Sequence, residues 1–327
     1  MSNPILSVQD LKVHFSTAND KGFFKGYTPL KAVDGVSFEL RPGQTLGVVG
    51  ESGCGKSTLG RAILRLVNFT EGTVSWLGKD LGLLSKNSVI EARRDLQIVF
   101  QDPVASLDPR MTTGNIIGEP LRNYLPHMSK TERENVVKDM LVKVGLSPQM
   151  INRYPHEFSG GQCQRIGIAR AMILGPKLVV CDEPVSSLDV SIQAQVVNLL
   201  MALQKEFDLA LVFISHDLAI IKHISHQILV LYLGKVMEHA TVDALYSNPL
   251  HPYTQALLSA IPIPDPVRER NKSQIILSGE IPSPLAPPSG CVFRTRCFKA
   301  TEICSDVAPK LESVREGHEI ACHHWVS

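Results

Sequence analysis

The stretch Thr45-Leu-Gly-Val-Val49, followed by Gly50-Glu-Ser-Gly-Cys-Gly-Lys56-Ser57, decides the fold of this chain. Its first five residues are a short apolar run typical of a buried strand, and the residues from Ser57 to Leu66 follow a helical pattern. Between them, glycines let backbone N–H groups turn inward around phosphate oxygens, while the lysine supplies charge and the serine hydroxyl can ligate Mg²⁺. The stretch therefore predicts a phosphate-binding loop, or P-loop, between a strand and a helix.

Short apolar runs elsewhere in the chain suit buried parallel strands, at residues 96–100, 178–182, 211–215 and 227–232. Before the P-loop, residues 5–8 and 30–49 also have strand composition, broken by turns at Asp34-Gly35 and Arg41-Pro-Gly43. Residues from about 85 to 175 are mostly helical in pattern, with an amphipathic stretch at 130–144. This alternation predicts an α/β domain with a helical subdomain at about 85–175.

The composition limits the classes of function. The chain has 327 residues, 44% of them hydrophobic, and a formal net charge of +1, which gives no electrostatic case for a nucleic-acid partner. No apolar run approaches the roughly 20 residues of a membrane helix, and the N-terminus lacks the pattern of a signal peptide. We therefore expect a cytoplasmic protein, held at any membrane by another chain.

Two carboxylates follow an apolar strand at Val179-Val-Cys-Asp182-Glu183. Asp182 is suited to hold Mg²⁺, directly or through water, and Glu183 to orient and deprotonate an attacking water. An isolated Asp-Glu pair can be merely a solvated strand end. Downstream of a P-loop, the catalytic interpretation is favoured.

A second glycine motif, Phe158-Ser-Gly-Gly-Gln162, precedes an amphipathic helical stretch about 100 residues after the P-loop. Its backbone N–H groups at a helix N-terminus suit an anion. Because the P-loop already surrounds its own phosphates, this second motif is best explained if it serves a nucleotide bound to another chain.

With these motifs, residues 1 to about 248 resemble the ATP-binding subunits of ABC transporters, which are P-loop NTPases. The set also includes a Gln-loop at Val99-Phe-Gln101-Asp102, a D-loop at Ser187-Leu-Asp189 and a switch histidine at Ile214-Ser-His216-Asp217. The resemblance implies ATP and Mg²⁺ as ligands. It also implies a head-to-tail pair of subunits, in which each ATP lies between one P-loop and the partner's signature motif.

The resemblance assigns a role to each matching residue. Gln101 senses Mg²⁺ and the membrane subunits, and His216 contacts the γ-phosphate. Phe15 is expected to stack on adenine, with Tyr27 or Phe24 as alternatives. The predicted nucleotide-binding residues are Phe15, Gly50, Glu51, Ser52, Gly53, Cys54, Gly55, Lys56, Ser57 and Thr58; the Mg²⁺ ligands are Ser57, Gln101 and Asp182; the catalytic residues are Glu183, His216 and Gln101; the D-loop residue is Asp189; and the signature residues acting in trans are Ser159, Gly160, Gly161 and Gln162.

The composition changes after about residue 248, and prolines become frequent up to Gly290, which predicts an extended connector. Two stretches, Asn248-Pro-Leu-His251-Pro252-Tyr253 and Ser278-Gly-Glu-Ile-Pro-Ser-Pro-Leu, resemble the C-terminal extension of bacterial peptide and nickel importers. We therefore predict two parts, an ATP-binding domain at 1–248 and a small irregular extension at 249–327.

The extension makes the whole chain similar to the second ATP-binding subunit of a dipeptide importer, with oligopeptides or nickel as alternative solutes. The resemblance implies a peripheral subunit on the cytoplasmic face of the inner membrane. Its implied partners are a second, homologous ATPase subunit, two membrane-spanning permease subunits and an extracytoplasmic solute-binding protein. A soluble ABC ATPase acting on ribosomes or nucleic acid is a second hypothesis, but those usually carry two such domains or a long coiled coil. A non-catalytic member is a third, against which the intact Lys56, Asp182, Glu183 and His216 argue.

Four cysteines, Cys291, Cys297, Cys304 and Cys322, crowd the last 37 residues. In a reducing compartment such a group indicates metal rather than disulfides. Their loose spacing and the resemblance favour a [4Fe–4S] cluster; zinc is an alternative, since His323 and His324 adjoin Cys322, and packing as small hydrophobes without metal is another. Because the group is far in sequence from the ATP motifs, we expect it to serve folding or partner docking.

Overall fold

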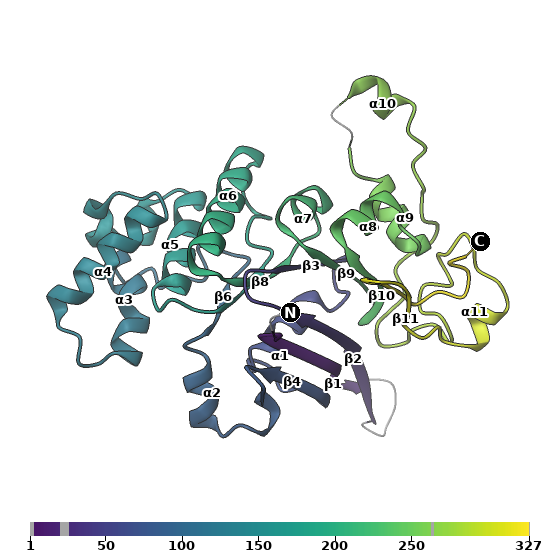
Figure 1. The fold of residues 1–327 in the computed structure, drawn as a ribbon, viewed down its shortest axis with the longest axis horizontal. Helices are drawn as coiled ribbons and strands as arrows, with labels where there is room; N and C mark the ends of the chain where they lie inside the picture. Colours follow the sequence, from purple (N-terminus) through teal and green to yellow (C-terminus); the bar gives the residue numbers. More distant parts are fainter. Residues whose placement is uncertain (1–2, 20–25, 263–264, 327) are drawn as a thin grey trace. The chain divides into compact units, whose positions relative to one another are not determined.

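The computed structural model describes residues 3–19, 26–262 and 265–326, and Figure 1 labels its elements along the chain. The chain forms two compact units. The helical unit comprises residues 3–5, 40–45 and 83–215, and the P-loop unit comprises the described parts of 6–39, 46–82 and 216–327. Both contain helices and sheets, so the predicted α/β fold is confirmed.

The helical unit contains three neighbouring parallel strands, β6 (Leu96–Val99), β7 (Leu178–Asp182) and β8 (Ala210–Ile214). All five residues of β7 and of β8 are buried. Parallel strands covered on both faces need such continuous apolar runs. The strands that the sequence predicted at these places are therefore confirmed to within one residue at each end.

Helices α3, α4 and α5 pack against one another in the same unit. A capping box starts α4: Ser129 accepts the N–H of Glu132, and Glu132 accepts the N–H of Ser129. The helices of this unit are α2 (Lys86–Ala92), α3 (Thr113–Tyr124), α4 (Lys130–Lys143), α5 (Gly160–Met172) and α6 (Val190–Phe207), with 3₁₀ turns η2 (Pro148–Asn152) and η3 (Pro155–Glu157). The 3₁₀ turn η1 (Leu81–Leu83) lies where the chain passes from the P-loop unit to the helical unit.

Two groups of strands build the P-loop unit. The first has the order β2-β1-β4-β5, from β1 (Leu6–Asn19), β2 (Gly26–Leu40), β4 (Glu71–Trp76) and β5 (Lys79–Asp80). The second has the order β11-β12-β10-β9-β3, from β3 (Thr45–Val49), β9 (Gln227–Tyr232), β10 (Lys235–Thr241), β11 (Glu312–Arg315) and β12 (His318–Ile320). In the second group β3 and β9 are parallel, and the other pairs are antiparallel.

Two local expectations are wrong. The turn predicted at Asp34-Gly35 does not interrupt β2, because Gly35 takes a φ of 89° within the continuous strand. The connector from Asn248 to Gly290 is not extended throughout, since it contains α9 (Pro252–Ser259) and α10 (Pro266–Arg270). Residues 271–290 contain no helix or strand.

The remaining helices of the P-loop unit are α1 (Lys56–Ile63), α7 (Leu218–Ile224), α8 (Val242–Ser247) and α11 (Ile303–Asp306). Strands β11 and β12 of the C-terminal extension form one edge of the second sheet, because β12 pairs with β10 eighty residues earlier in the chain. Within the described ranges, no helix has both the length and the apolarity that crossing a bilayer requires.

Candidate functional site

The P-loop joins β3 to α1 through two glycines that leave no room for a side chain. Gly50 has a φ of 151°, and a Cβ there would lie 2.2 Å from the carbonyl oxygen of Leu231. Gly55 has a φ of 105°, and a Cβ there would lie 2.0 Å from the carbonyl oxygen of Ala32. Only glycine fits this backbone path, so the pattern that the sequence shows has a steric cause.

The N-terminus of α1 carries no side-chain cap, because Gly55 occupies the N-cap position and the first turn has no acidic residue. A helix start of this kind favours an anion. Lys56 is only 4% exposed, and its Nζ donates to the carbonyl oxygens of Gly50 at 2.8 Å and Glu51 at 3.0 Å. Ser57 and Thr58 follow on the first turn of α1, both half-buried.

Two further predicted nucleotide contacts belong to the P-loop unit. His216 is exposed in the turn before α7, and the next residue, Asp217, caps α7 by accepting the N–H groups of Ala219 and Ile220. Phe15 lies on β1 and is 39% exposed, as an aromatic ring available for stacking must be. The alternatives for this role, Phe24 and the side chain of Tyr27, lie outside the described residues.

The helical unit brings together two predicted catalytic residues. Asp182 ends β7 and is 2% exposed. The next residue, Glu183, has a φ of 47°, a conformation that non-glycine residues adopt rarely, and its N–H donates to the carbonyl oxygen of Ile214 at 3.1 Å. Gln101 Nε2 donates to Glu183 Oε2 at 3.3 Å. The sequence indicated roles for both side chains but not this contact between them.

The signature motif lies at the exposed start of α5. Ser159 and Gln162 form a reciprocal capping box, in which Ser159 Oγ accepts the N–H of Gln162 and Gln162 Oε1 accepts the N–H of Ser159. Gly161 packs closely on α6, because a Cβ there would lie 2.6 Å from Ile192 Cγ2 and would force Ile192 to shift. Ile192 is two residues beyond the first residue of α6, whose N-cap is Asp189, so the signature and the D-loop pack together.

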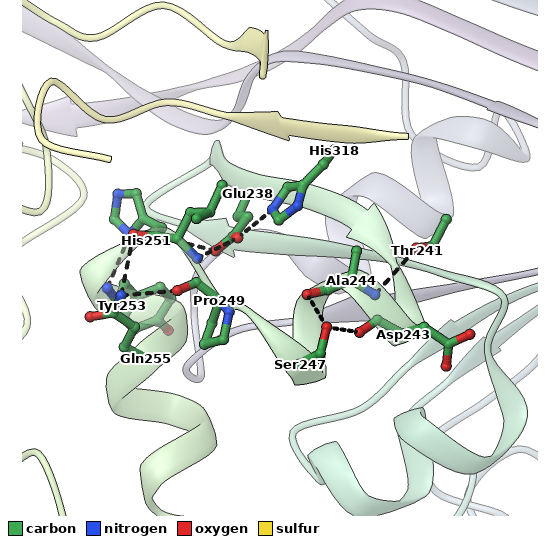
Figure 2. A network of polar contacts seen from close by, with 11 residues as sticks. Glu238, Thr241, Asp243, Ala244, Ser247, Pro249, His251, Tyr253, Gln255 and His318 are labelled. Carbon is green, nitrogen blue, oxygen red and sulfur yellow. Dashed lines mark hydrogen bonds and ion pairs between the residues drawn. The ribbon is translucent and has the colours of Figure 1, made fainter. Parts of the chain in front are cut away.

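A buried polar network fixes the start of α9 (Figure 2). Glu238 on β10 is fully buried; its carboxylate accepts the N–H groups of Leu250 at 2.9 Å and His251 at 3.0 Å, and His318 Nε2 lies 2.7 Å from Glu238 Oε1. His251 is the N-cap of α9, and its Nδ1 accepts the N–H of Tyr253. The His-Pro-Tyr sequence at 251–253 is therefore a helix start clamped to β10.

The ionisation states of this network follow from its burial. Burial lowers the pKa of His251 to about 4, against the opposing charge of Glu238, so the imidazole is neutral at pH 7. Burial alone would raise the pKa of Glu238, but the hydrogen bonds from His318 and from the backbone of Leu250 and His251 hold it below its ordinary value. Glu238 is therefore a buried carboxylate that stays ionised.

The four C-terminal cysteines lie within electrostatic reach of one another. Burial, with smaller contributions from the charges of the other three, raises the pKa of Cys291 to about 11. Two of the sulfurs accept backbone N–H groups: Cys297 from Lys299 at 3.4 Å and Cys322 from His324 at 3.3 Å. However, among the described residues no three or more His, Cys, Asp or Glu side chains form a group that could hold a metal ion. This geometry does not support the predicted metal centre.

One residue of the C-terminal segment was missed by the sequence analysis. Arg296, next to Cys297, forms an ion pair with Glu51 of the P-loop. The C-terminal extension is therefore far from the ATP motifs in sequence but contacts the P-loop in the fold. The two residues are 245 positions apart and belong to no common motif, so no sequence signal could have paired them.

Comparisons with known proteins agree with the motifs. The family profile described as ABC transporter matches residues 33–186, and that of the oligopeptide/dipeptide transporter C-terminal region matches residues 237–304. The chain is 60% identical over 319 residues to the oligopeptide transport ATP-binding protein OppF of Salmonella typhimurium, covering 97% of this chain and 95% of that protein. OppF of Escherichia coli has the same identity and coverage, and a putative oligopeptide transport ATP-binding protein, YkfD of Bacillus subtilis, is 53% identical, covering 98% of this chain and 95% of that protein.

Solved structures agree with the fold. The chain is similar to the ATP-binding cassette MJ0796, whose structure is described as dimeric, in a post-hydrolysis state, bound to ADP and Pi. The TM-score is 0.63 at 27% identity, and the match covers 72% of this chain and 98% of that one. The structure of cbiO1 from Clostridium perfringens matches with a TM-score of 0.64 at 23% identity, covering 75% of this chain and 92% of that one.

Proposed function

Because this chain belongs to the oligopeptide-transport ATP-binding proteins of the ABC transporter family, we propose that it energises the import of oligopeptides into the cytoplasm. Within that family it is an ATPase subunit whose activity is coupled to peptide transport. The proposal depends on two features that occur in the same chain. The P-loop has no room for a side chain at Gly50 and Gly55, and the C-terminal region matches the peptide-transporter type.

The P-loop and the first turn of α1 hold the ATP phosphates, with Lys56 as the main counter-charge. Ser57, Asp182 and Gln101 would hold Mg²⁺, which would supply positive charge to the phosphate groups during the reaction. Glu183 takes a proton from the attacking water, and its hydrogen bond from Gln101 orients the carboxylate for that task. His216 contacts the γ-phosphate, and Phe15 stacks on adenine.

Hydrolysis takes place between two subunits in this proposal. Ser159 to Gln162 and Asp189 act on the ATP of a second, homologous subunit, as suits their exposed position at the starts of α5 and α6. The dimeric structure of the similar cassette MJ0796 supports this arrangement. The pair works on the cytoplasmic face of the inner membrane with two permease subunits, and an extracytoplasmic solute-binding protein delivers the peptide.

Oligopeptides are favoured over dipeptides and nickel as the solute. The sequence alone put dipeptides first, but the relatives that match at 60% identity are named for oligopeptide transport. The test is uptake of labelled dipeptide, tetrapeptide and nickel by cells that lack this chain, with and without its restoration. We expect only tetrapeptide uptake to depend on the chain. Dependence of dipeptide or nickel uptake alone would contradict the choice of solute, and no dependence at all would contradict the transport role.

Although the described side chains form no group that could hold a metal ion, we propose, from the number and spacing of the C-terminal cysteines, that they hold a [4Fe–4S] cluster rather than a zinc ion. A cubane takes four thiolates, and backbone N–H groups directed at its sulfur ligands tune it. Zinc sites usually show paired Cys-x₂₋₄-Cys knuckles, which the spacing of these four cysteines lacks. The cluster would link the chain segments around Cys291, Cys304 and Cys322.

Anaerobic purification tests this proposal. We expect brown protein with absorbance near 400 nm and about four irons per chain. Colourless protein with stoichiometric zinc would contradict the cluster. Metal-free protein with four titratable thiols would contradict any metal.

A further inference from the structure

Two residues of the C-terminal extension contact Glu51 of the P-loop, one at its carboxylate and one at its backbone N–H. Arg296 donates twice to its carboxylate, from Nη1 to Oε2 at 2.6 Å and from Nη2 to Oε1 at 3.0 Å. The hydroxyl of Tyr253 on α9 accepts the N–H of Glu51 at 2.9 Å. We propose that Arg296 is a positioning residue for nucleotide binding, which holds the first turn of the P-loop in its phosphate-binding conformation. This inference rests on the proposed binding of ATP phosphates by that loop.

The pair differs from an ordinary surface ion pair in its burial. Arg296 is 9% exposed, and its guanidinium carbon lies 5.9 Å from the centre of the Tyr232 ring. Behind it, the fully buried rings of Tyr232, Tyr253 and Phe293 pack with centroids 5.0 to 5.2 Å apart. A bidentate pair whose arginine is already fixed by packing costs little further entropy and is weakly screened by salt. The bond to Glu51 also raises the pKa of Arg296, so its charge is permanent.

The backbone of Glu51 is bound as completely as its side chain. Its carbonyl oxygen accepts Lys56 Nζ at 3.0 Å and the N–H of Cys54 at 3.3 Å, while Tyr253 accepts its N–H. When ATP binds, the ammonium of Lys56 turns to the phosphates and its bonds to the loop weaken. The contacts from Arg296 and Tyr253 come from outside the phosphate cradle, so they persist. The extension therefore stabilises the P-loop when the hydrogen bonds from Lys56 to the loop carbonyls weaken.

A cavity beside the loop explains why such support is needed. A space of about 80 Å³ is lined by residues 51–54 of the loop, by Tyr232 and Leu233, and by Ile281 and Pro284 of the connector. On this side the loop borders a pocket and is not packed against other protein atoms, so contacts elsewhere must hold it. Glu51 is the residue through which the extension fixes it.

The test compares ATP binding and hydrolysis in variants of the full chain. Arg296→Gln removes the charge, and we expect the Kd for ATP·Mg²⁺ to rise about 3- to 30-fold. In the assembled transporter the KM for ATP should rise in proportion while kcat changes little, because the catalytic groups are untouched. Arg296→Lys should restore part of the affinity. The double variant with Glu51→Gln should bind no more weakly than the weaker single variant, because both remove one interaction.

Arg294→Gln is the matched control, because Arg294 lies in the same segment but bonds to Ser289 instead of the P-loop. It should leave the Kd unchanged. If Arg296→Gln impairs folding, the Kd of Glu51→Gln for ATP·Mg²⁺ tests the proposal by itself. This variant removes the ion pair but leaves Arg296 packed on Tyr232.

Three outcomes would overturn the proposal: wild-type Kd in both Arg296→Gln and Glu51→Gln, an equal loss in Arg294→Gln, or additive losses in the double variant. Failure of the proposed ATP site is distinguishable, because the unmodified chain would then bind no ATP.

Discussion

Glu183 occupies a backbone conformation that its type of residue avoids. A φ of 47° costs a non-glycine residue of the order of 1 kcal/mol, and here the N–H bond to Ile214 and the side-chain bond from Gln101 maintain it. Strain of this kind is kept where position matters more than stability. The carboxylate is therefore held in place before any nucleotide arrives, as the role of general base that we propose for it requires.

Replacing Glu183 with Gln removes the base and keeps the size of the side chain. We expect hydrolysis by the assembled transporter to fall by about 10²- to 10⁴-fold, while ATP binding stays near wild type. Phosphate release and nucleotide binding measured in parallel check this. Glu206→Gln at the end of α6 is the control and should hydrolyse normally. Unchanged turnover in Glu183→Gln would refute the assignment.

Replacing Lys56 with Ala should weaken the binding of ATP rather than the hydrolysis step. The bound phosphates lose a buried counter-charge, so we expect the Kd for ATP·Mg²⁺ to rise at least about 30-fold. Calorimetry on the purified chain measures this, with the exposed Lys86→Ala as control. Wild-type affinity in Lys56→Ala would mean that the phosphates bind elsewhere.

Among the elements, those made of continuous apolar runs could be predicted from sequence and those with buried polar groups could not. β3, β7 and β9 have the predicted bounds. β10 was missed because Glu238 and His239 make it resemble a surface loop, and its partner β12 comes eighty residues later. Part of the connector is helical because Pro252 takes the first helical position, where a proline needs no N–H partner.

The residues of the candidate site also fall into those that the sequence could predict and those that it could not. Glycine and carboxylate motifs follow from local spacing, so P-loop geometry and the position of Glu183 could be predicted. The contacts Gln101–Glu183 and Arg296–Glu51 arise only from the tertiary fold. No local pattern encodes them.

The clamp at the start of α9 makes the stability of the protein depend on pH. The folded-state pKa of His251 is about 4, below its unfolded value near 6.5, so between these values the unfolded chain binds more protons. Stability should therefore fall as the pH drops from 6.5 to 4, by up to about 1.4 kcal/mol per pH unit from this group. Below about pH 4.5, loss of the charge on Glu238 adds to the fall, since its pKa is also lowered.

His251→Asn isolates this contribution, because asparagine can still cap α9 but does not titrate. Urea unfolding between pH 4 and 7 should show a shallower slope in this variant than in the wild type. The exposed His127→Asn should keep the wild-type slope. Equal slopes in all three proteins would show that His251 is not buried neutral.

At the scale of the whole molecule, the ATP motifs are shared between the two units. The P-loop and His216 belong to the P-loop unit, while Gln101, Glu183 and the signature belong to the helical unit. The signature has its own reciprocal cap at an exposed helix start, so it needs nothing from its own P-loop. This independence fits a motif that acts on a second subunit.

Ser159→Arg should stop hydrolysis at the P-loop of the partner subunit and leave ATP binding by this chain's own P-loop intact. Photolabelling of each subunit with an azido-ATP, together with phosphate release, separates the two effects. Ser129→Arg is a matched control, because it removes the same kind of capping box from α4 at a similar cost of about 1 kcal/mol. Equal loss of hydrolysis in both variants, or a crosslink from Ser159 to its own Lys56, would contradict action in trans.

The pairing of β12 with β10 has a consequence for synthesis. A ribosome makes the P-loop early, at about 5–20 residues per second, but Arg296 and His318 belong to the last tenth of the chain. Until they emerge from the exit tunnel, Glu51 and Glu238 each lack a side-chain hydrogen-bond partner that they have in the finished protein. A translation product that stops before residue 296 keeps two such carboxylates, one at the P-loop and one in the interior. We therefore expect a prematurely terminated chain to have a less stable P-loop and to be cleaved readily by proteases. It would not be a working ATPase that merely lacks its contacts with the transporter.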